Sequence, residues 1–334
     1  MEDQRENLIL VTGGAGYIGS HTVLELLRAG KNVLVIDNLS TSDKENYVRL
    51  SKQYPYLLSF KEQDLREKDQ LIQLFDSYSI GTVIHFAGYK SVGESVRNPL
   101  KYYNNNIHST VVLLQVMEMF GVKNIIFSSS ASVYGTPKEL PIPETHSLNP
   151  QSPYGRTKYF LEEILQDVAR ADPEFNCVIL RYFNPVGADS SKILRENPRG
   201  KPENLMPYIV KVIRGEYAHL NVFGDNYETQ DGTGVRDYIH VVDLARGHLA
   251  ALKMFTENND DKNVHIYNLG TGVGYSVKEM VSTMSKISGC IIPVQVTNRR
   301  AGDVPICYAD PSKALEDLGW KAKLDIGEMC QDSI

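Results

Sequence analysis

The sequence contains no apolar run that approaches the ~20 residues of a membrane-spanning helix. Its net charge is −6, so the chain has no general attraction for nucleic acid or for an anionic membrane surface. Cysteine is scarce: the chain has Cys177, Cys290, Cys307 and Cys330, which are widely separated and form no C-x-x-C pair. No H-E-x-x-H motif occurs either. The polar start of the sequence does not resemble a signal peptide. We therefore expect a reduced, cytoplasmic protein without a metal site, and with neither nucleic acid nor membrane as a partner.

Alternating strand-like and helix-like patterns fill the first half of the sequence. Short apolar runs occur at 7–13, 32–37, 57–64, 81–88, 122–131 and 175–184. Helical spacing of apolar residues occurs between them at 18–30, 68–78, 99–121 and 152–170. Buried apolar strands that alternate with amphipathic helices form a parallel sheet covered on both faces. We therefore predict an α/β fold with right-handed crossover connections.

The composition changes after Asn184. Residues 185–235 are rich in proline, glycine and asparagine and contain one clear helical pattern at 204–216. A strand and helix pattern resumes over about 236–270. We predict a first domain at 1–184 and a smaller α/β domain at 185–334, with 236–270 returning to the first domain.

The glycine-rich stretch VTGGAGYIGSH follows the first predicted strand and opens a helix. Gly16 and Gly19, with either Gly13 or Gly14, have the spacing that lets the backbone approach a pyrophosphate at the positive end of a helix. Asp37 ends the second strand, where a carboxylate binds an adenosine ribose and repels a 2′-phosphate. The following residues, NLS, include no arginine, so the sequence favours NAD over NADP. A strand-turn-helix without a ligand is the alternative.

Tyr154 and Lys158 stand four residues apart in the stretch SPYGRTK, which places them on one face of a helix. Ser152 is a suitable N-cap and Pro153 a suitable first helical residue. This spacing alone is compatible with an ordinary surface pair as well as with a proton-transfer centre. A tyrosine that accepts an alcohol proton needs its pKa lowered from ~10, and a neighbouring cation such as Lys158 lowers it.

Seven motifs, found in order along nearly the whole chain, resemble one known family. They are TGGAGYIGSH, HFAG, FSSSASVYG, SPYGRTK, RYFNPVGA, NLMPYI and DGTGVRDYIHVVDLA. Together they are similar to the extended short-chain dehydrogenase/reductases, and more closely to the UDP-galactose 4-epimerases. The resemblance implies a Rossmann-type doubly wound sheet with a smaller substrate domain, and a tightly bound NAD. It also implies interconversion of UDP-galactose and UDP-glucose in galactose metabolism, by transient oxidation at sugar C4, rotation of the 4-keto sugar and hydride return. Members of the family are usually homodimers, which here would pair helices near 100–120 and 153–170.

The resemblance also assigns residues by position. The catalytic residues it implies are Tyr154, Lys158 and Ser130. The cofactor-binding residues it implies are Gly13, Gly16, Tyr17, Ile18, Gly19, Asp37, Asn38, Asp64, Leu65, Phe86, Ala87, Gly88, Lys90, Asn105, Ser128, Tyr154, Lys158 and Tyr182. The residues implied for the UDP-sugar are Lys90, Ser130, Tyr154, Phe183, Asn184, Asn204, Leu205, Asn221, Val222, Phe223, Arg236, Tyr238, Arg300, Asp303 and Cys307.

Several alternatives stay open at this point. Arg236 and Arg300 suit a diphosphate, but both have an aspartate nearby and could form surface ion pairs instead. Asp64 could form a turn rather than meet the adenine. The small side chain of Cys307 stands where some relatives have tyrosine, so we expect UDP-N-acetyl sugars to be accepted as well.

Two other functions compete with the epimerase interpretation. Nucleotide-sugar 4,6-dehydratases and decarboxylases of the same fold usually carry an acidic residue just before VYG, and this chain has Ala131 and Ser132 there. Non-catalytic NAD-binding regulators keep the glycine loop but often lose the tyrosine or the lysine. This chain keeps both, so we expect an enzyme.

Overall fold

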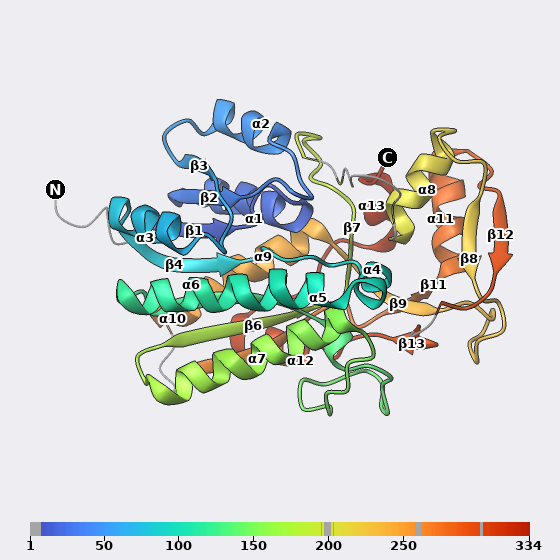
Figure 1. The fold of residues 1–334 in the computed structure, drawn as a ribbon. Coiled ribbons are helices and arrows are strands. Elements are labelled where there is room, and N and C mark those ends of the chain that lie inside the picture. The colour runs from blue at the N-terminus through green and yellow to red at the C-terminus, as the bar shows by residue number, and fades with distance from the viewer. Residues whose placement is uncertain (1–7, 195, 197–201, 203, 258–261, 301–302) are drawn as a thin grey trace.

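The structure is a computed structural model that describes residues 8–194, 196, 202, 204–257, 262–300 and 303–334. The strands of its main sheet are β1 (Leu8–Thr12), β2 (Val33–Asp37), β3 (Leu58–Glu62), β4 (Ile80–His85), β5 (Asn124–Ser130), β6 (Asn176–Tyr182) and β10 (Val264–Leu269). These seven strands are parallel and lie in the order β10-β6-β5-β4-β1-β2-β3 (Figure 1). The predicted Rossmann-type parallel sheet is therefore confirmed. The strand order reverses between β1 and β4, and ligands bind such sheets in the crevice at this point.

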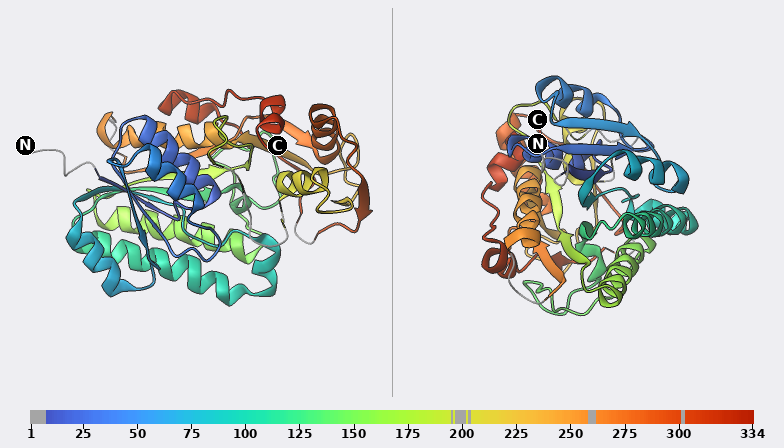
Figure 2. Two further views of the ribbon diagram at one scale, coloured as in Figure 1. Left: turned by 90° about the horizontal axis from the view of Figure 1, so that it is seen from above. Right: turned by 90° about the vertical axis from the view of Figure 1, so that its left-hand side faces the viewer.

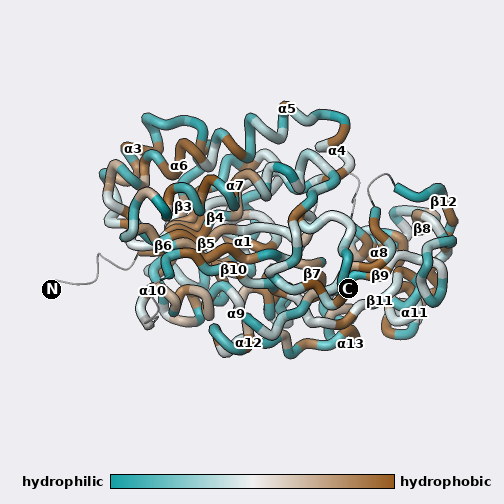
Figure 3. Tube along the Cα trace, turned by 90° about the horizontal axis from the view of Figure 1, so that it is seen from below, coloured by the Kyte–Doolittle hydropathy of each residue, from teal (hydrophilic) through white to brown (hydrophobic). Residues whose placement is uncertain are grey.

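Helices cover both faces of the sheet, as the end-on view in Figure 2 shows. One face is covered by α1 (Tyr17–Arg28), α2 (Glu45–Gln53), α9 (Val241–Leu252), α10 (Met254–Glu257) and α12 (Ser312–Leu318). The other face is covered by α3 (Lys68–Ser77), α6 (His108–Met119) and α7 (Pro153–Ala171). Each layer of helices buries its own apolar cluster against the strands, which form the hydrophobic centre of Figure 3. Within the described ranges, no helix has the length and apolar character that crossing a membrane requires.

The long helix predicted at 99–121 is interrupted in the structure. It consists of α5 (Pro99–Tyr102), a single π-helical turn η1 (Tyr103–Ile107) and α6. A π turn holds one residue more than an α turn and often occurs beside a functional site. Here it places Asn105 and Asn106 next to the carboxyl end of β4, where Asn106 bonds to the chain at Tyr89. A short helix, α4 (Val92–Arg97), connects β4 to this segment.

A second, smaller group of elements lies beyond the carboxyl edge of the main sheet, at the right of Figure 1. Its strands are β7 (Asn184–Val186), β8 (Leu220–Phe223), β9 (Val235–His240), β11 (Gly274–Ser276), β12 (Val294–Thr297) and β13 (Ile306–Cys307). Strand β9 pairs with β7, β11 and β13, while β8 pairs with β12. The helices α8 (Leu205–Ile213), α11 (Val277–Ser288) and α13 (Ile326–Gln331) pack around a separate apolar cluster. Strand β10 and helix α9 come from the later part of the chain, but β10 belongs to the seven-stranded sheet and α9 covers one face of it.

Candidate active site

The loop between β1 and α1 is closed by glycines that allow very close backbone contacts. Gly13 has a φ of +68°, and a Cβ there would lie 2.7 Å from the amide nitrogen of Ala87. A Cβ at Gly19 would lie 2.4 Å from the carbonyl oxygen of Gly13. Gly16 differs, because a Cβ there would meet only the carbonyl oxygen of Gly13, at 3.3 Å. The loop is therefore packed on its protein side and open at Gly16, where the N-terminus of α1 faces a cavity.

A cavity of about 1460 Å³ lies in front of this loop. Every residue of the predicted cofactor set lines it, from Gly13 and Asp37 at one end to Tyr154, Lys158 and Tyr182 at the other. The size of the cavity and the open face at Gly16 fit a dinucleotide such as NAD. The predicted substrate residues that line it are Lys90, Tyr154, Asn204, Arg300 and Asp303. The structure places the others outside the lining; they are Ser130, Phe183, Asn184, Leu205, Asn221, Val222, Phe223, Arg236, Tyr238 and Cys307.

Two carboxylates lie at the ends of β2 and β3. Asp37 accepts hydrogen bonds from the amide of Ala15 at 3.1 Å and from the hydroxyl of Ser42 at 2.9 Å, so it ties the glycine loop to the loop after β2. Asp64 accepts hydrogen bonds from the guanidinium of Arg66 and from Asn38. These bonds, Arg66 first, hold the pKa of Asp64 well below its usual range. Asp64 therefore shapes a turn in addition to lining the cavity.

Helix α7 presents Tyr154 and Lys158 to the other end of the cavity. The hydroxyl of Ser152 caps the helix by accepting a hydrogen bond from the amide of Gly155 at 3.1 Å. Lys158 is 6% exposed and donates from Nζ to the carbonyl oxygen of Ser128 at 2.6 Å. Burial lowers the pKa of Lys158 to about 8. Burial raises the pKa of Tyr154, and its hydrogen bond with Ser130 opposes that rise.

A buried polar network attaches α7 to the main sheet, and no motif in the sequence indicated it. Glu162 on α7 accepts hydrogen bonds from Ser129 on β5 and from Arg181 on β6, the latter at 2.7 Å. Arg181 also donates to the hydroxyl of Tyr134 at 3.0 Å, which in turn donates to Asn268 on β10 at 2.6 Å. A buried ion pair needs such additional hydrogen bonds to offset its desolvation. The network links three strands to the helix that carries Tyr154 and Lys158.

Asn106 is a second site residue that sequence reasoning missed. Its side chain accepts from the amide of Tyr89 at 2.8 Å and donates to the carbonyl of Tyr89 at 3.0 Å. It also donates to the hydroxyl of Thr157 on α7, at 3.1 Å. One amide therefore fixes the loop after β4 against the catalytic helix. The run of three asparagines at 104–106 was the available signal, because such residues are poor in helix interiors.

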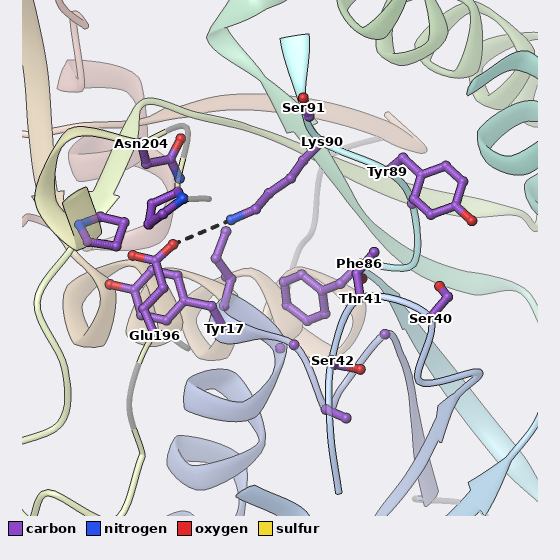
Figure 4. A pocket seen from close by; sticks show the side chains of 18 of the residues that line it. Tyr17, Ser40, Thr41, Ser42, Phe86, Tyr89, Lys90, Ser91, Glu196 and Asn204 are labelled. Carbon is purple, nitrogen blue, oxygen red and sulfur yellow. Dashed lines mark ion pairs between the residues drawn. The ribbon is translucent and has the colours of Figure 1, made fainter. Parts of the chain in front are cut away.

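Lys90 extends from the same loop across the cavity, as Figure 4 shows. Its Nζ lies 3.6 Å from a carboxylate oxygen of Glu196, and burial raises the pKa of Glu196. Asn204 precedes α8 at the N-cap position but makes no capping bond, and its side chain is hydrogen-bonded to Glu196. Lys90 and Asn204 therefore meet at one carboxylate, between the two groups of elements.

The arginines of the smaller group are engaged in different ways. The guanidinium of Arg236 lies 3.7 Å from a carboxylate oxygen of Asp303, and that of Arg300 lies 3.7 Å from the ring centre of Phe223. Asp237, the sequence neighbour of Arg236, is fully buried and accepts main-chain hydrogen bonds from Thr271, at 2.8 Å, and from residues 272 and 309. Asp237 is thus part of the backbone framework that holds β9, and it is not a surface ion-pair partner.

Comparison with known proteins identifies close relatives. A family model described as GDP-mannose 4,6 dehydratase matches residues 10–333. The UDP-glucose 4-epimerase of Homo sapiens is 52% identical, with 97% of this chain and 94% of that protein aligned. The UDP-glucose 4-epimerase of Bacillus subtilis (strain 168) is also 52% identical, with 97% and 95% aligned. The crystal structure of UDP-glucose 4-epimerase from Bifidobacterium longum in complex with NAD⁺ and UDP is 50% identical, with a TM-score of 0.93 over 98% of this chain and 96% of that one.

Two glycine substitutions should separate ligand binding from folding. Gly16→Ala is expected to weaken dinucleotide binding by at least about tenfold, because the added methyl fills the face that a pyrophosphate approaches. The backbone at Gly16 has φ −72°, which alanine adopts freely, so the melting temperature without ligand should change little. Gly19→Ala should lower that melting temperature markedly, since its methyl would lie against the carbonyl of Gly13. Equal effects of the two substitutions on both measurements would contradict this division of roles.

Proposed function

This chain belongs to the UDP-glucose 4-epimerase family, and from that premise we propose that the cavity between the glycine loop and α7 is where C4 of the sugar is inverted. The enzyme interconverts UDP-galactose and UDP-glucose with NAD as its cofactor. The observation that carries the assignment of the site is the group of Tyr154, Ser130 and Lys158. Tyr154 is hydrogen-bonded to Ser130, and Lys158 lies in the same wall of a cavity lined by the whole dinucleotide set.

Tyr154, Ser130 and Lys158 have different roles in the transfer of the proton from the sugar 4-hydroxyl. Tyr154, as the phenolate, takes the proton of the sugar 4-hydroxyl while hydride leaves the carbon. Ser130 orients the reacting groups through its hydrogen bond with Tyr154, and its own oxygen accepts hydrogen bonds from the amide and hydroxyl of Ser132, the latter at 3.0 Å. NAD⁺ supplies the hydride acceptor and a positive charge that, together with Lys158, lowers the pKa of the phenol. The sugar becomes a 4-keto sugar, turns over in the site and is reduced on its other face.

We assign substrate binding to residues of the smaller group of elements, on the side of the cavity away from α7. Arg300 and Asp303 line it there, and Arg236 lies beside Asp303. Guanidinium groups match the oxygens of a diphosphate, so we assign Arg236 and Arg300 to the diphosphate of the UDP-sugar. Firm binding of the UDP leaves the sugar free to rotate. Of the other predicted substrate residues, Asn184 lies on β7, Asn221, Val222 and Phe223 lie on β8, Tyr238 lies on β9 and Cys307 lies on β13. Asn204 and Leu205 lie at the start of α8, and Phe183 directly precedes β7.

The dehydratase and decarboxylase alternatives receive no support from the site. The matching family model bears a dehydratase name, but relatives at 52% identity are epimerases. Dehydration needs an additional acid and base. Residues 131 and 132, where the acidic pair of those enzymes would stand, are alanine and serine in a short 3₁₀ turn after β5. The hydroxyl of Ser132 is directed to Ser130 instead.

Product analysis with a single substitution tests the proposed site. The unaltered protein should convert UDP-galactose to UDP-glucose without net formation of NADH. Tyr154→Phe should reduce turnover by about 10²–10⁴-fold, the usual contribution of a positioned base, while UDP binding changes little. Tyr159→Phe, on the same helix, is the matched control and should keep normal turnover. Normal turnover of Tyr154→Phe would rule out the proposed base, and a dehydrated or decarboxylated product would rule out the epimerase assignment.

We also propose that the enzyme accepts UDP-N-acetyl sugars. Cys307 is 9% exposed and pairs with Arg236 across β13 and β9, so it lies beside the proposed diphosphate site. A cysteine leaves space there for a 2-acetamido group. Cys307→Tyr should reduce turnover of UDP-GalNAc by at least about tenfold relative to UDP-galactose, because the larger ring fills that space. Cys307→Ala should turn over both substrates, and a lack of UDP-GalNAc turnover in the unaltered protein would refute the proposal.

A homodimer that pairs α6 and α7 of each subunit is a further proposal. Exposed apolar side chains lie on α7 and on α5, which precedes α6: Phe160 on α7 is 41% exposed and Leu100 on α5 is 79% exposed. The ring of Phe160 stacks on that of Tyr103, with 6.4 Å between ring centres. Apolar patches of this kind favour association. Phe160→Glu should halve the mass measured by light scattering. Tyr56→Glu, at a distant exposed position, should not, and a single-chain mass for the unaltered protein would contradict the dimer.

The cysteines support a proposed location in the cytoplasm. All four are described by the structure and are free thiols, with Cys177, Cys307 and Cys330 buried. Free thiols persist in a reducing compartment.

A further inference from the structure

His248 lies on α9 directly behind the cavity wall and is fully buried. Its Nδ1 is 2.9 Å from the carbonyl oxygen of Leu244, one helical turn earlier. Its Nε2 forms a short hydrogen bond with the hydroxyl of Tyr182. The ring packs against Phe86, with 4.9 Å between ring centres. His248 itself does not line the cavity, whereas Tyr182 and Phe86 do.

The partners of His248 decide which atoms carry protons. The carbonyl of Leu244 can only accept a hydrogen bond, so Nδ1 carries the hydrogen. Burial lowers the pKa of His248 to about 4, so the ring is neutral at pH 7. A neutral ring protonated at Nδ1 has a bare Nε2, which can only accept. Tyr182 must therefore donate its hydroxyl proton to His248.

This direction is passed on to Ser128. The side chains of Ser128 and Tyr182 are hydrogen-bonded, and the proton of Tyr182 is already directed to His248. Ser128 must then donate to Tyr182. Ser128 lines the cavity, and its hydroxyl oxygen has only lone pairs to offer a further partner. The main-chain carbonyl of Ser128, which accepts from Lys158, is an acceptor as well.

We infer that His248 is a positioning residue that sets the direction of the chain Ser128, Tyr182, His248, Leu244, and thereby makes the Ser128 hydroxyl a hydrogen-bond acceptor toward the cavity. This oxygen then selects a ligand group that bears N–H. The inference rests on the proposed function, in which Tyr154 works beside the reactive end of the bound cofactor. That end is the nicotinamide, and its carboxamide NH₂ is the hydrogen-bond donor on the ring. His248 would thus favour the carboxamide over groups of the same shape without N–H.

The chain offers a matched control in His21 on α1, which packs against α9. His21 is also buried, and its Nδ1 lies 2.8 Å from the carbonyl of Tyr17, one turn earlier. Burial likewise lowers its pKa to about 4. Its Nε2 accepts a hydrogen bond from the backbone amide of Asp189 at 3.2 Å. The hydrogen-bond chain through His21 therefore does not reach a hydroxyl that lines the cavity.

The experiment measures which dinucleotide the purified full-length protein retains. Bound cofactor is first removed, and the protein is then equilibrated with equal amounts of NAD⁺ and 3-acetylpyridine adenine dinucleotide, in which a methyl group replaces the NH₂. Free dinucleotide is removed, and the bound pair is separated by chromatography. The unaltered protein should prefer NAD⁺ by about 10- to 100-fold, the effect of leaving a buried acceptor unpaired. His248→Phe keeps a ring but removes the acceptor, and its preference should fall below about threefold.

Further variants keep the test decisive. His248→Gln places an amide oxygen near Tyr182 and should restore part of the preference. Tyr182→Phe removes the link and should lose the preference even if His248→Phe folds poorly. His21→Phe should keep the full preference. A preference that survives His248→Phe and Tyr182→Phe, or one that His21→Phe abolishes equally, overturns the inference. Equal retention of both dinucleotides by the unaltered protein overturns this inference alone, whereas a protein that binds neither overturns the proposed function with it.

Discussion

The contact between the glycine loop and the end of β4 is the constraint on which the site depends. Gly13 and Gly19 bring three backbone segments closer than any side chain allows, with Ala87 at one side. This contact places the N-terminus of α1 at the reversal of strand order between β1 and β4. The cavity, the position of Asp37 and the reach of Lys90 all follow from it. Substitutions at Gly13 or Gly19 therefore disturb the fold of the loop itself, and they affect the chemistry of the site only as a consequence.

At the opposite end of the cavity, buried polar groups hold the elements that carry the site residues in place. Glu162 and Arg181 fix α7 to β5 and β6, and Asn106 fixes the loop after β4 to α7. Each group is satisfied by several partners, which offsets the desolvation of burying it. The catalytic helix is thus restrained from two sides. Tyr154 and Lys158 are therefore placed by contacts of other residues of α7 in addition to their own.

The seven-stranded sheet could be predicted well from the sequence, whereas the second, smaller group of elements could not, and the reasons are physical. Apart from the edge strand β3, the strands of the main sheet are largely buried and apolar, so their runs stand out. The glycine loop has a spacing that few other structures require. Helix α11 and strands β8 and β12 were not predicted, because β12 is a short, exposed edge strand without a continuous apolar run. In the site, residues with a motif were found from the sequence. Asn106, Glu162 and His248 were missed, because their roles depend on partners far away in the chain.

The π turn at residues 103–107 limits how this chain can vary in length. Removing one residue there would convert α5, η1 and α6 into one regular α-helix. Everything before the deletion would then rotate by about 100° around the axis relative to α6. Asn106 could no longer reach both Tyr89 and Thr157. Insertions and deletions that a surface helix would normally tolerate are therefore excluded from this turn, and its length is set by the active site rather than by the stability of the helix.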